Sequence, residues 1–173
     1  ITANHIVMLG QSAVDPPELF IGSLTLTAIE TKQITTCNRD FRKTYAIAKP
    51  TSKWITAADG HRIHTWIMRP PSQRSRRRGP GILQIHGGPH AMYGWAFFHE
   101  FQCQAAAGYT IYYANPRGSK GYGQAHCSSI RGNWGSTDWT DIEAVRDAML
   151  ADSKLDPDRL CVMGGSYGGY MTN

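Results

Sequence analysis

The chain has 173 residues, which is enough for one buried core and a fragment of a second unit, because a domain takes roughly 100 to 200 residues. Hydrophobic residues make up 41% of the sequence and charged residues 18%, and these ordinary globular values exclude an intrinsically disordered chain. No run approaches the roughly 18 uninterrupted apolar residues that a membrane span requires, so we expect a soluble protein with no membrane partner.

A good part of the formal net charge of +5 comes from one short segment that holds Arg74, Arg76, Arg77 and Arg78. A basic run can bind a phosphate backbone, but no aromatic residues interleave with this one and no nucleic-acid-binding motif surrounds it. We therefore expect a solvated loop and no nucleic-acid partner.

The four cysteines are widely spaced and form no C-x-x-C pair: Cys37, Cys103, Cys127 and Cys161. This spacing indicates neither a zinc ribbon nor a redox motif, and we expect reduced thiols. Residues 1–10 lack the basic stretch and long apolar run of a signal peptide. The sequence has no starting methionine and stops abruptly at Asn173, so we interpret it as a piece of a longer reading frame, with cytoplasmic location as the default expectation.

Short β-type runs separated by turn residues fill the first part of the chain, at 6–9, 18–24 and 26–36. Three such strands cannot bury a core without partners, so we expect them to complete a sheet that begins upstream. Lys49 and Pro50 mark the joint to the next part of the chain.

After this joint the pattern predicts a hairpin and then alternating strands and helices. Two β-rich runs, 53–57 and 61–68, flank Asp59-Gly60, and an Asp-Gly step between such runs is a strong hairpin signal. Further strands are predicted at 82–85, 109–114 and 160–163, and helices at 95–107 and from Thr140 onward. Thr140 and Glu143 spell a capping box for the second helix, whose buried face we expect to carry Ile142, Val145, Ala148 and Met149.

Strands that alternate with helices favour an α/β fold with a parallel sheet covered on both faces. In such a sheet, functional sites lie at the carboxyl ends of the strands. We therefore expect functional residues in the segments that directly follow the strands at 82–85 and 160–163.

Gly164-Gly165-Ser166-Tyr167-Gly168-Gly169 directly follows the last predicted strand and fits the G-x-S-x-G nucleophile elbow. At such an elbow the serine lies on a sharp, strained turn, and Gly164 and Gly168 are needed because the strand and helix backbones come close together. The turn would expose the Ser166 hydroxyl and aim the backbone N–H of Tyr167 at a developing oxyanion. A phosphate-binding loop is the competing interpretation, but it would need a Lys-Ser/Thr pair, which is absent.

The His-Gly-Gly-Pro sequence at 86–89 follows an earlier strand, where an α/β-hydrolase needs a second backbone donor for the oxyanion. We assign this donor to Gly88, with Gly87 beside it. His86 is expected to orient the loop through hydrogen bonds and not to act as the catalytic base.

The remaining histidines do not predict a metal site. His61 and His64 are three residues apart on a predicted strand, which places them on opposite faces. The others have no carboxylate partner at ligand spacing, and His90 is the one that we expect near the mouth of the site.

With both motifs in place, the sequence resembles the prolyl oligopeptidase family of serine peptidases (S9), and most closely its acylaminoacyl-peptidase and dipeptidyl-peptidase-like branch. The matching stretches fall in the family's order and spacing, at 85–90, 115–119 with 121–123, 131–135, 156–159 and 164–173. More weakly, 17–20 and 33–35 are similar to the last blade of the β-propeller that precedes the peptidase domain.

The resemblance implies two domains: residues 1–49 as the C-terminal remnant of a β-propeller, and residues 50–173 as the N-terminal half of an α/β-hydrolase peptidase domain. It implies acyl-enzyme catalysis on short peptides without a cofactor, in which Ser166 is the nucleophile and the amides of Tyr167 and Gly88 hold the oxyanion. The family's acid and histidine follow the serine, and only seven residues do so here, so we expect this chain alone to be inactive and to need the rest of the protein.

Two other functions remain open at this point. An esterase on the same fold would share the elbow but would not explain the β-rich leader. A catalytically inactive fragment that serves as a binding module is favoured only by the missing acid and histidine.

Overall fold

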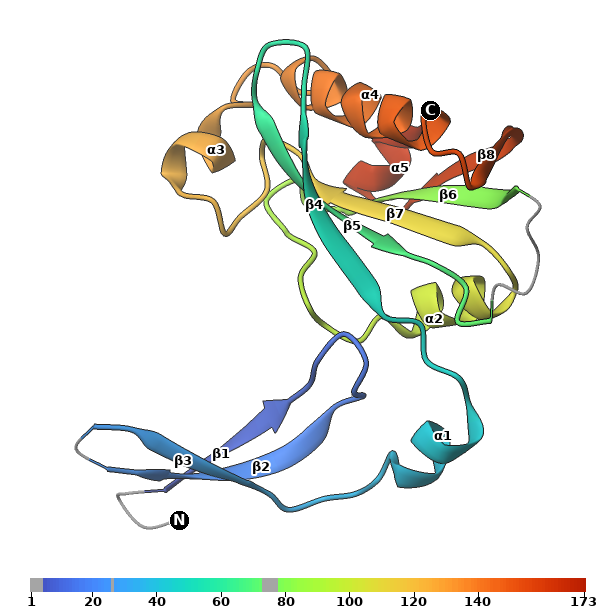
Figure 1. Ribbon diagram of the computed structural model, residues 1–173. Helices are drawn as coiled ribbons and strands as arrows, with labels where there is room; N and C mark the ends of the chain where they lie inside the picture. The colour runs from blue at the N-terminus through green and yellow to red at the C-terminus, as the bar shows by residue number, and fades with distance from the viewer. Residues whose placement is uncertain (1–4, 26, 73–77) are drawn as a thin grey trace. The chain divides into compact units, whose positions relative to one another are not determined.

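The computed structural model describes residues 5–25, 27–72 and 78–173 (Figure 1). The chain forms two compact units, one of Ile1–Ile47 with Trp95–His99 and one of Ala48–Gly94 with Glu100–Asn173. Of the arginine-rich segment, Arg74, Arg76 and Arg77 lie outside the described residues, so the solvated loop stays a prediction. Within the described ranges, no helix is both long enough and apolar enough to cross a membrane.

The first unit contains an antiparallel meander of three strands, in the order β1 (His5–Gly10), β2 (Glu18–Leu24) and β3 (Ile29–Gln33). A short helix, α1 (Arg39–Thr44), follows the third strand. The three predicted β-type runs are thus strands, although β3 is shorter than the predicted run and residue 26 lies outside the described part.

Glu18 ties the start of β2 to the segment that leads into α1. Its carboxylate accepts hydrogen bonds from the Thr35 hydroxyl, the Cys37 N–H (3.1 Å) and the Asn38 N–H (2.7 Å). These bonds, that of Thr35 first, lower the pKa of Glu18 because they stabilise the ionised carboxylate. The acid is therefore charged at neutral pH and holds the connection in place.

The second unit is built on a five-stranded sheet in the order β4-β5-β7-β6-β8. Its strands are β4 (Pro50–Thr56), β5 (Arg62–Met68), β6 (Gly79–Ile85), β7 (Thr110–Asn115) and β8 (Leu155–Gly164). The pairs β6–β7 and β6–β8 are parallel, as expected for an α/β fold.

The first two strands form the predicted hairpin and are the antiparallel part of the sheet. β4 pairs with β5 and β5 pairs with β7 in antiparallel fashion. The predicted Asp59-Gly60 turn joins β4 to β5, with Gly60 at a φ of 84°, and a connection this short forces an antiparallel pair.

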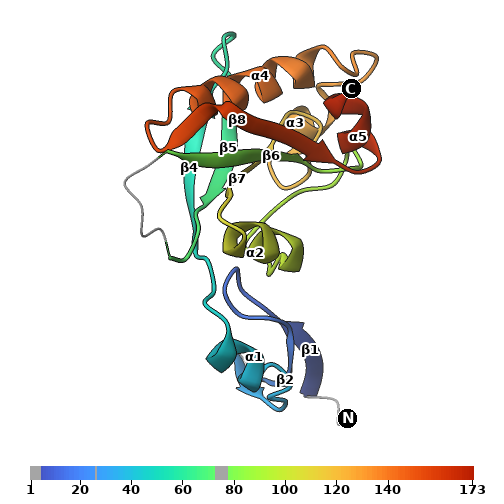
Figure 2. The same ribbon diagram turned by 90° about the vertical axis from the view of Figure 1, so that its right-hand side faces the viewer.

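Helices cover both faces of this sheet (Figure 2). α2 (His99–Ala106) lies on one face and α4 (Thr137–Leu150) on the other. α3 (Gln124–Ser128) interrupts the Gly-rich connection after β7, and α5 (Tyr167–Thr172) follows β8 directly. The predicted helix over 95–107 is correct in type but begins only at His99, because residues 95–98 are not helical.

The predicted capping box at Thr140 and Glu143 was wrong. α4 begins at Thr137, so Thr140 lies inside the helix, where its hydroxyl donates back to the Ser136 carbonyl at 3.3 Å. Asp138 serves the start of the helix instead, since its carboxylate accepts the Gly135 N–H at 2.9 Å. A Thr-x-x-Glu spacing inside a helix has the same sequence signature as one at its start, and this ambiguity displaced the prediction by one turn.

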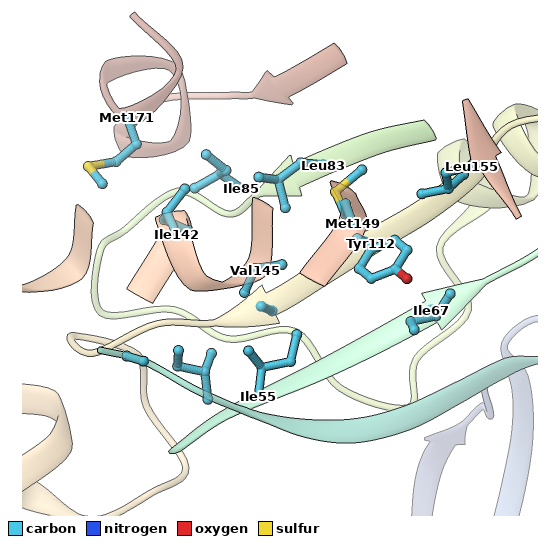
Figure 3. Packing of buried hydrophobic residues seen from close by; sticks show 13 residues of the cluster. Ile55, Ile67, Leu83, Ile85, Tyr112, Ile142, Val145, Met149, Leu155 and Met171 are labelled. Carbon is cyan, nitrogen blue, oxygen red and sulfur yellow. The ribbon is translucent and has the colours of Figure 1, made fainter. Parts of the chain in front are cut away.

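The core of the second unit lies between the sheet and α4 (Figure 3). Ile142, Val145 and Met149 of α4 are at most 4% exposed and pack on a sheet surface that includes Leu83 and Tyr112. This is the helix face that the sequence predicted, and Ala148 is partly buried beside it. The packing fixes α4 across the strands whose ends carry the site.

β8 is an edge strand of the described sheet. Val162 and Met163 on this strand are 38% and 42% exposed, and Cys161 is exposed as well. An exposed apolar edge presents unpaired backbone groups to any other chain. It therefore favours self-association.

We expect the 173-residue chain, expressed alone, to self-associate, and the substitution Val162→Lys to reduce this because a charge on an edge strand opposes strand pairing. Light scattering and size-exclusion chromatography measure the effect. The matched control is Ser153→Lys, at an exposed position of the loop before β8, which should change association little. A monodisperse monomer with a sharp cooperative melt for the unaltered chain would contradict this expectation.

Candidate active site

Ser166 lies at the sharp turn between β8 and α5. Its φ is 57° and its ψ is −120°, and among the described residues it is the only non-glycine with a positive φ. Its carbonyl accepts the Tyr170 N–H at 3.1 Å, so Ser166 is the residue that opens the helix, and it is exposed. A non-glycine residue in this region of backbone space is strained and persists only where its surroundings hold it.

The surroundings that hold Ser166 are two glycines packed against backbone. A Cβ at Gly168 would lie 2.0 Å from the Ile85 carbonyl oxygen at the end of β6. A Cβ at Gly164 would lie 2.5 Å from the carbonyl carbon of Gly168. The ends of β6 and β8 and the start of α5 therefore meet with no room for side chains, which is the physical requirement that the sequence motif predicted.

Substitution of these glycines tests the close approach directly. We expect Gly168→Ala to destabilise the full-length protein by about 1–3 kcal/mol or more, because the new methyl group overlaps backbone atoms that cannot move aside cheaply. Gly165→Ala is a matched control one residue before the serine, since a Cβ there meets nothing within 4 Å. Denaturant unfolding measures both, and equal stability of the two variants would contradict the packing described here.

The loop at 86–90 lies beside the serine because of the sheet register. β6 and β8 are parallel neighbours, and Ile85 is paired with Gly164, so the loops that follow the two strands start at the same level. A Cβ at Gly87 would lie 3.3 Å from the Ser166 Cβ and 3.8 Å from its Oγ. Gly88, the next residue, has a φ of 126°, a backbone conformation that favours glycine. The two motifs that the sequence singled out are thus brought together.

His86 is buried and uses both ring nitrogens inside the loop structure. Its Nδ1 lies 2.7 Å from the Gly87 carbonyl oxygen, and its Nε2 lies 2.9 Å from the Ser119 hydroxyl. Burial, the largest effect, lowers the pKa of His86 and favours the neutral ring. These contacts fit an orienting role for the loop and leave neither nitrogen directed at Ser166.

Tyr167, the residue after the serine, is anchored by its side chain. Its hydroxyl donates a hydrogen bond to Asp138 Oδ2, and its ring meets that of Trp134 edge-on at a centroid distance of 5.1 Å. Burial, and after it the bond to Asp138, raises the pKa of the Tyr167 hydroxyl, which therefore keeps its proton. The sequence reasoning missed Asp138, whose only signal was an acidic residue near the start of a helix.

Arg117 joins three segments next to the site. Its guanidinium pairs with Asp141, which is fully buried on α4, and with Asp59 of the β4–β5 turn. The backbone N–H of Arg117 also donates to Asp141, at 2.6 Å. The pKa of Asp59 is lowered by a bond from the His61 N–H and by Arg117. The network fixes the loop after β7, on which the Ser119 partner of His86 lies.

His61, His64 and His90 contact three different groups. His61 Nε2 lies 3.1 Å from His126 Nδ1, whereas His64 Nδ1 lies 2.9 Å from the Tyr122 hydroxyl. His90, in the loop at 86–90, has its Nδ1 2.8 Å from the carbonyl oxygen of Gly118, which lies in the loop after β7. In the part of the chain that the structure describes, no group of three or more His, Cys, Asp or Glu residues is placed to hold a metal ion. All four cysteines are free thiols.

Comparisons by sequence and by structure both find that the chain is similar to peptidases. Residues 95–173 match the model of the prolyl oligopeptidase family. The chain is 47% identical over 145 residues to the uncharacterized peptidase YuxL of Bacillus subtilis, a match that covers 83% of this chain and 22% of that protein. It is 37% identical to dipeptidyl-peptidase 5 of Schizosaccharomyces pombe, over 69% of this chain and 18% of that protein.

Among solved structures, the acylaminoacyl peptidase of Pyrococcus horikoshii superposes on the chain with a TM-score of 0.87 at 30% identity. The match covers 99% of this chain and 27% of that one. The chain thus spans about a fifth of the length of these two curated relatives and about a quarter of the length of the solved structure.

Proposed function

The chain belongs to the prolyl oligopeptidase family of serine peptidases, and we propose that in the whole protein Ser166 is the nucleophile that attacks a peptide carbonyl. The observation that carries this proposal is the strained, exposed turn at Ser166, which lies against Gly87 of the neighbouring loop. Backbone strain of this kind at an accessible hydroxyl is typical of a functional site.

The oxyanion that forms in this reaction needs backbone donors, and the turn supplies one at Tyr167. Tyr167 is the first residue of α5, and the first N–H groups of a helix have no acceptor within the helix. Gly88, with Gly87 beside it, is the second donor that we propose. Two such donors stabilise the negative charge in the transition state more than the neutral carbonyl of the substrate, and this difference lowers the barrier.

The base and the acid of the triad are proposed to come from sequence downstream of Asn173. The triad order of this fold is Ser, then Asp or Glu, then His, and His86 is fully engaged with Gly87 and Ser119. Loss of the base costs on the order of 10⁶ in turnover in a serine peptidase, so the 173-residue chain alone is expected to be inactive.

The division of the chain supports a matching domain assignment. We propose that residues 1–49 end a β-propeller and that residues 50–173 begin the peptidase domain, because the compact units change at Ile47 and Ala48. We propose short peptides with a free or an acylated amino terminus as the substrates. The relatives named dipeptidyl-peptidase and acylaminoacyl peptidase support this choice.

The substitution Ser166→Ala in the full-length protein tests the proposed nucleophile. We expect hydrolysis of aminoacyl or acyl-aminoacyl amides to fall by roughly 10³-fold or more, because the acyl-enzyme cannot form. Release of a chromogenic amine measures turnover. Ser153→Ala, at an exposed serine in the loop before β8, is the matched control and should retain full activity.

Retention of amide hydrolysis by Ser166→Ala would refute the nucleophile. Cleavage of simple esters without cleavage of any amide would support the esterase alternative in place of a peptidase. A full-length protein that turns over neither substrate class would favour the binding module.

A further inference from the structure

The side chain of Tyr167 is held by a carboxylate from another element of the fold. Asp138, in the first turn of α4, accepts the Tyr167 hydroxyl on Oδ2. On its other oxygen, Oδ1, it accepts the Gly135 N–H at 2.9 Å and the Trp139 N–H at 3.1 Å. The carboxylate thus links Tyr167 to the start of α4.

Asp138 is 1% exposed, and a carboxylate this deeply buried is costly unless donors compensate it. Its three donors occupy both oxygens, so the side chain has little freedom to rotate. Because α4 is itself packed on the sheet, Asp138 is a fixed point relative to the strands that carry the site.

The segment before Asp138 also lies against α5. The Trp134 ring meets the Tyr167 ring edge-on, and a Cβ at Gly135 would lie 2.5 Å from the Tyr170 hydroxyl. The contacts involve tyrosines one turn apart on the same face of α5, so this segment and the helix form a packed pair.

We propose that Asp138 is a positioning residue: through the Tyr167 hydroxyl it fixes the orientation of the Ser166–Tyr167 peptide, whose N–H serves as an oxyanion donor. A donor gains its catalytic value from being held in place before the charge develops. The inference rests on the proposed function of Ser166 and adds the group that holds its oxyanion donor.

The experiment is a double-mutant cycle in the full-length protein, with kcat and KM measured for the amide substrate. Tyr167→Phe removes the hydroxyl but keeps the ring, and Asp138 retains two backbone donors, so this variant should fold. We expect kcat to fall about 10- to 100-fold with KM within about threefold of the starting value, since the lost interaction acts mainly in the transition state.

Asp138→Ala should lower kcat to a similar degree, and the double variant should be no worse than the more severe single one, because both changes break the same link. Asp147→Asn, at an exposed position of α4, is the matched control and should keep kcat unchanged.

A kcat for Tyr167→Phe within about twofold of the starting protein, with Ser166→Ala inactive, would overturn the inference and leave the proposed function intact. So would a rise confined to KM, which would place the hydroxyl in substrate binding, or effects of Asp138→Ala and Tyr167→Phe that simply multiply. Full activity of Ser166→Ala would instead refute the proposed function itself.

Discussion

The site depends on direct backbone contact between β6, β8 and α5 at the carboxyl end of the sheet in the second unit. Gly168 of α5 lies against the Ile85 carbonyl of β6, and Gly164 of β8 lies against Gly168. With no side chains between these segments, the chain can leave β8 and enter α5 only through a sharp turn, and Ser166 takes up a positive φ there. The strain at Ser166 is local, whereas the packing that sustains it comes from three separate elements.

The order of the strands determines which loops share this site. Because β6 and β8 are parallel neighbours, in register at Ile85 and Gly164, the His-Gly-Gly loop and the serine turn emerge side by side. α4 packs on one face of the five-stranded sheet through Ile142, Val145 and Met149. Its first turn brings Asp138 to Tyr167. The hydrophobic core and the polar contacts of the site are therefore parts of one arrangement, since the helix that buries the core also carries the carboxylate.

The sequence predicted the features that arise from local rules. The Asp59-Gly60 hairpin, the buried face of α4 and the requirement for glycine at 164 and 168 each follow from turn chemistry, helical period or steric limits within a short window. The antiparallel β5–β7 pair and the contact between Asp138 and Tyr167 join segments far apart in the chain, and no local pattern encodes such pairings. The predicted start of α4 was wrong because Thr140 and Glu143, which lie inside the helix, have the same spacing as a capping box.

We propose that the turn presents Ser166 as a nucleophile beside donors for negative charge. A fluorophosphonate reacts with an activated serine and leaves a covalent adduct that mass spectrometry assigns to a peptide. Treatment of the full-length protein should place the adduct on Ser166, and denaturation before treatment should abolish it. An adduct on another residue, or none in a preparation that cleaves peptides, would contradict the account.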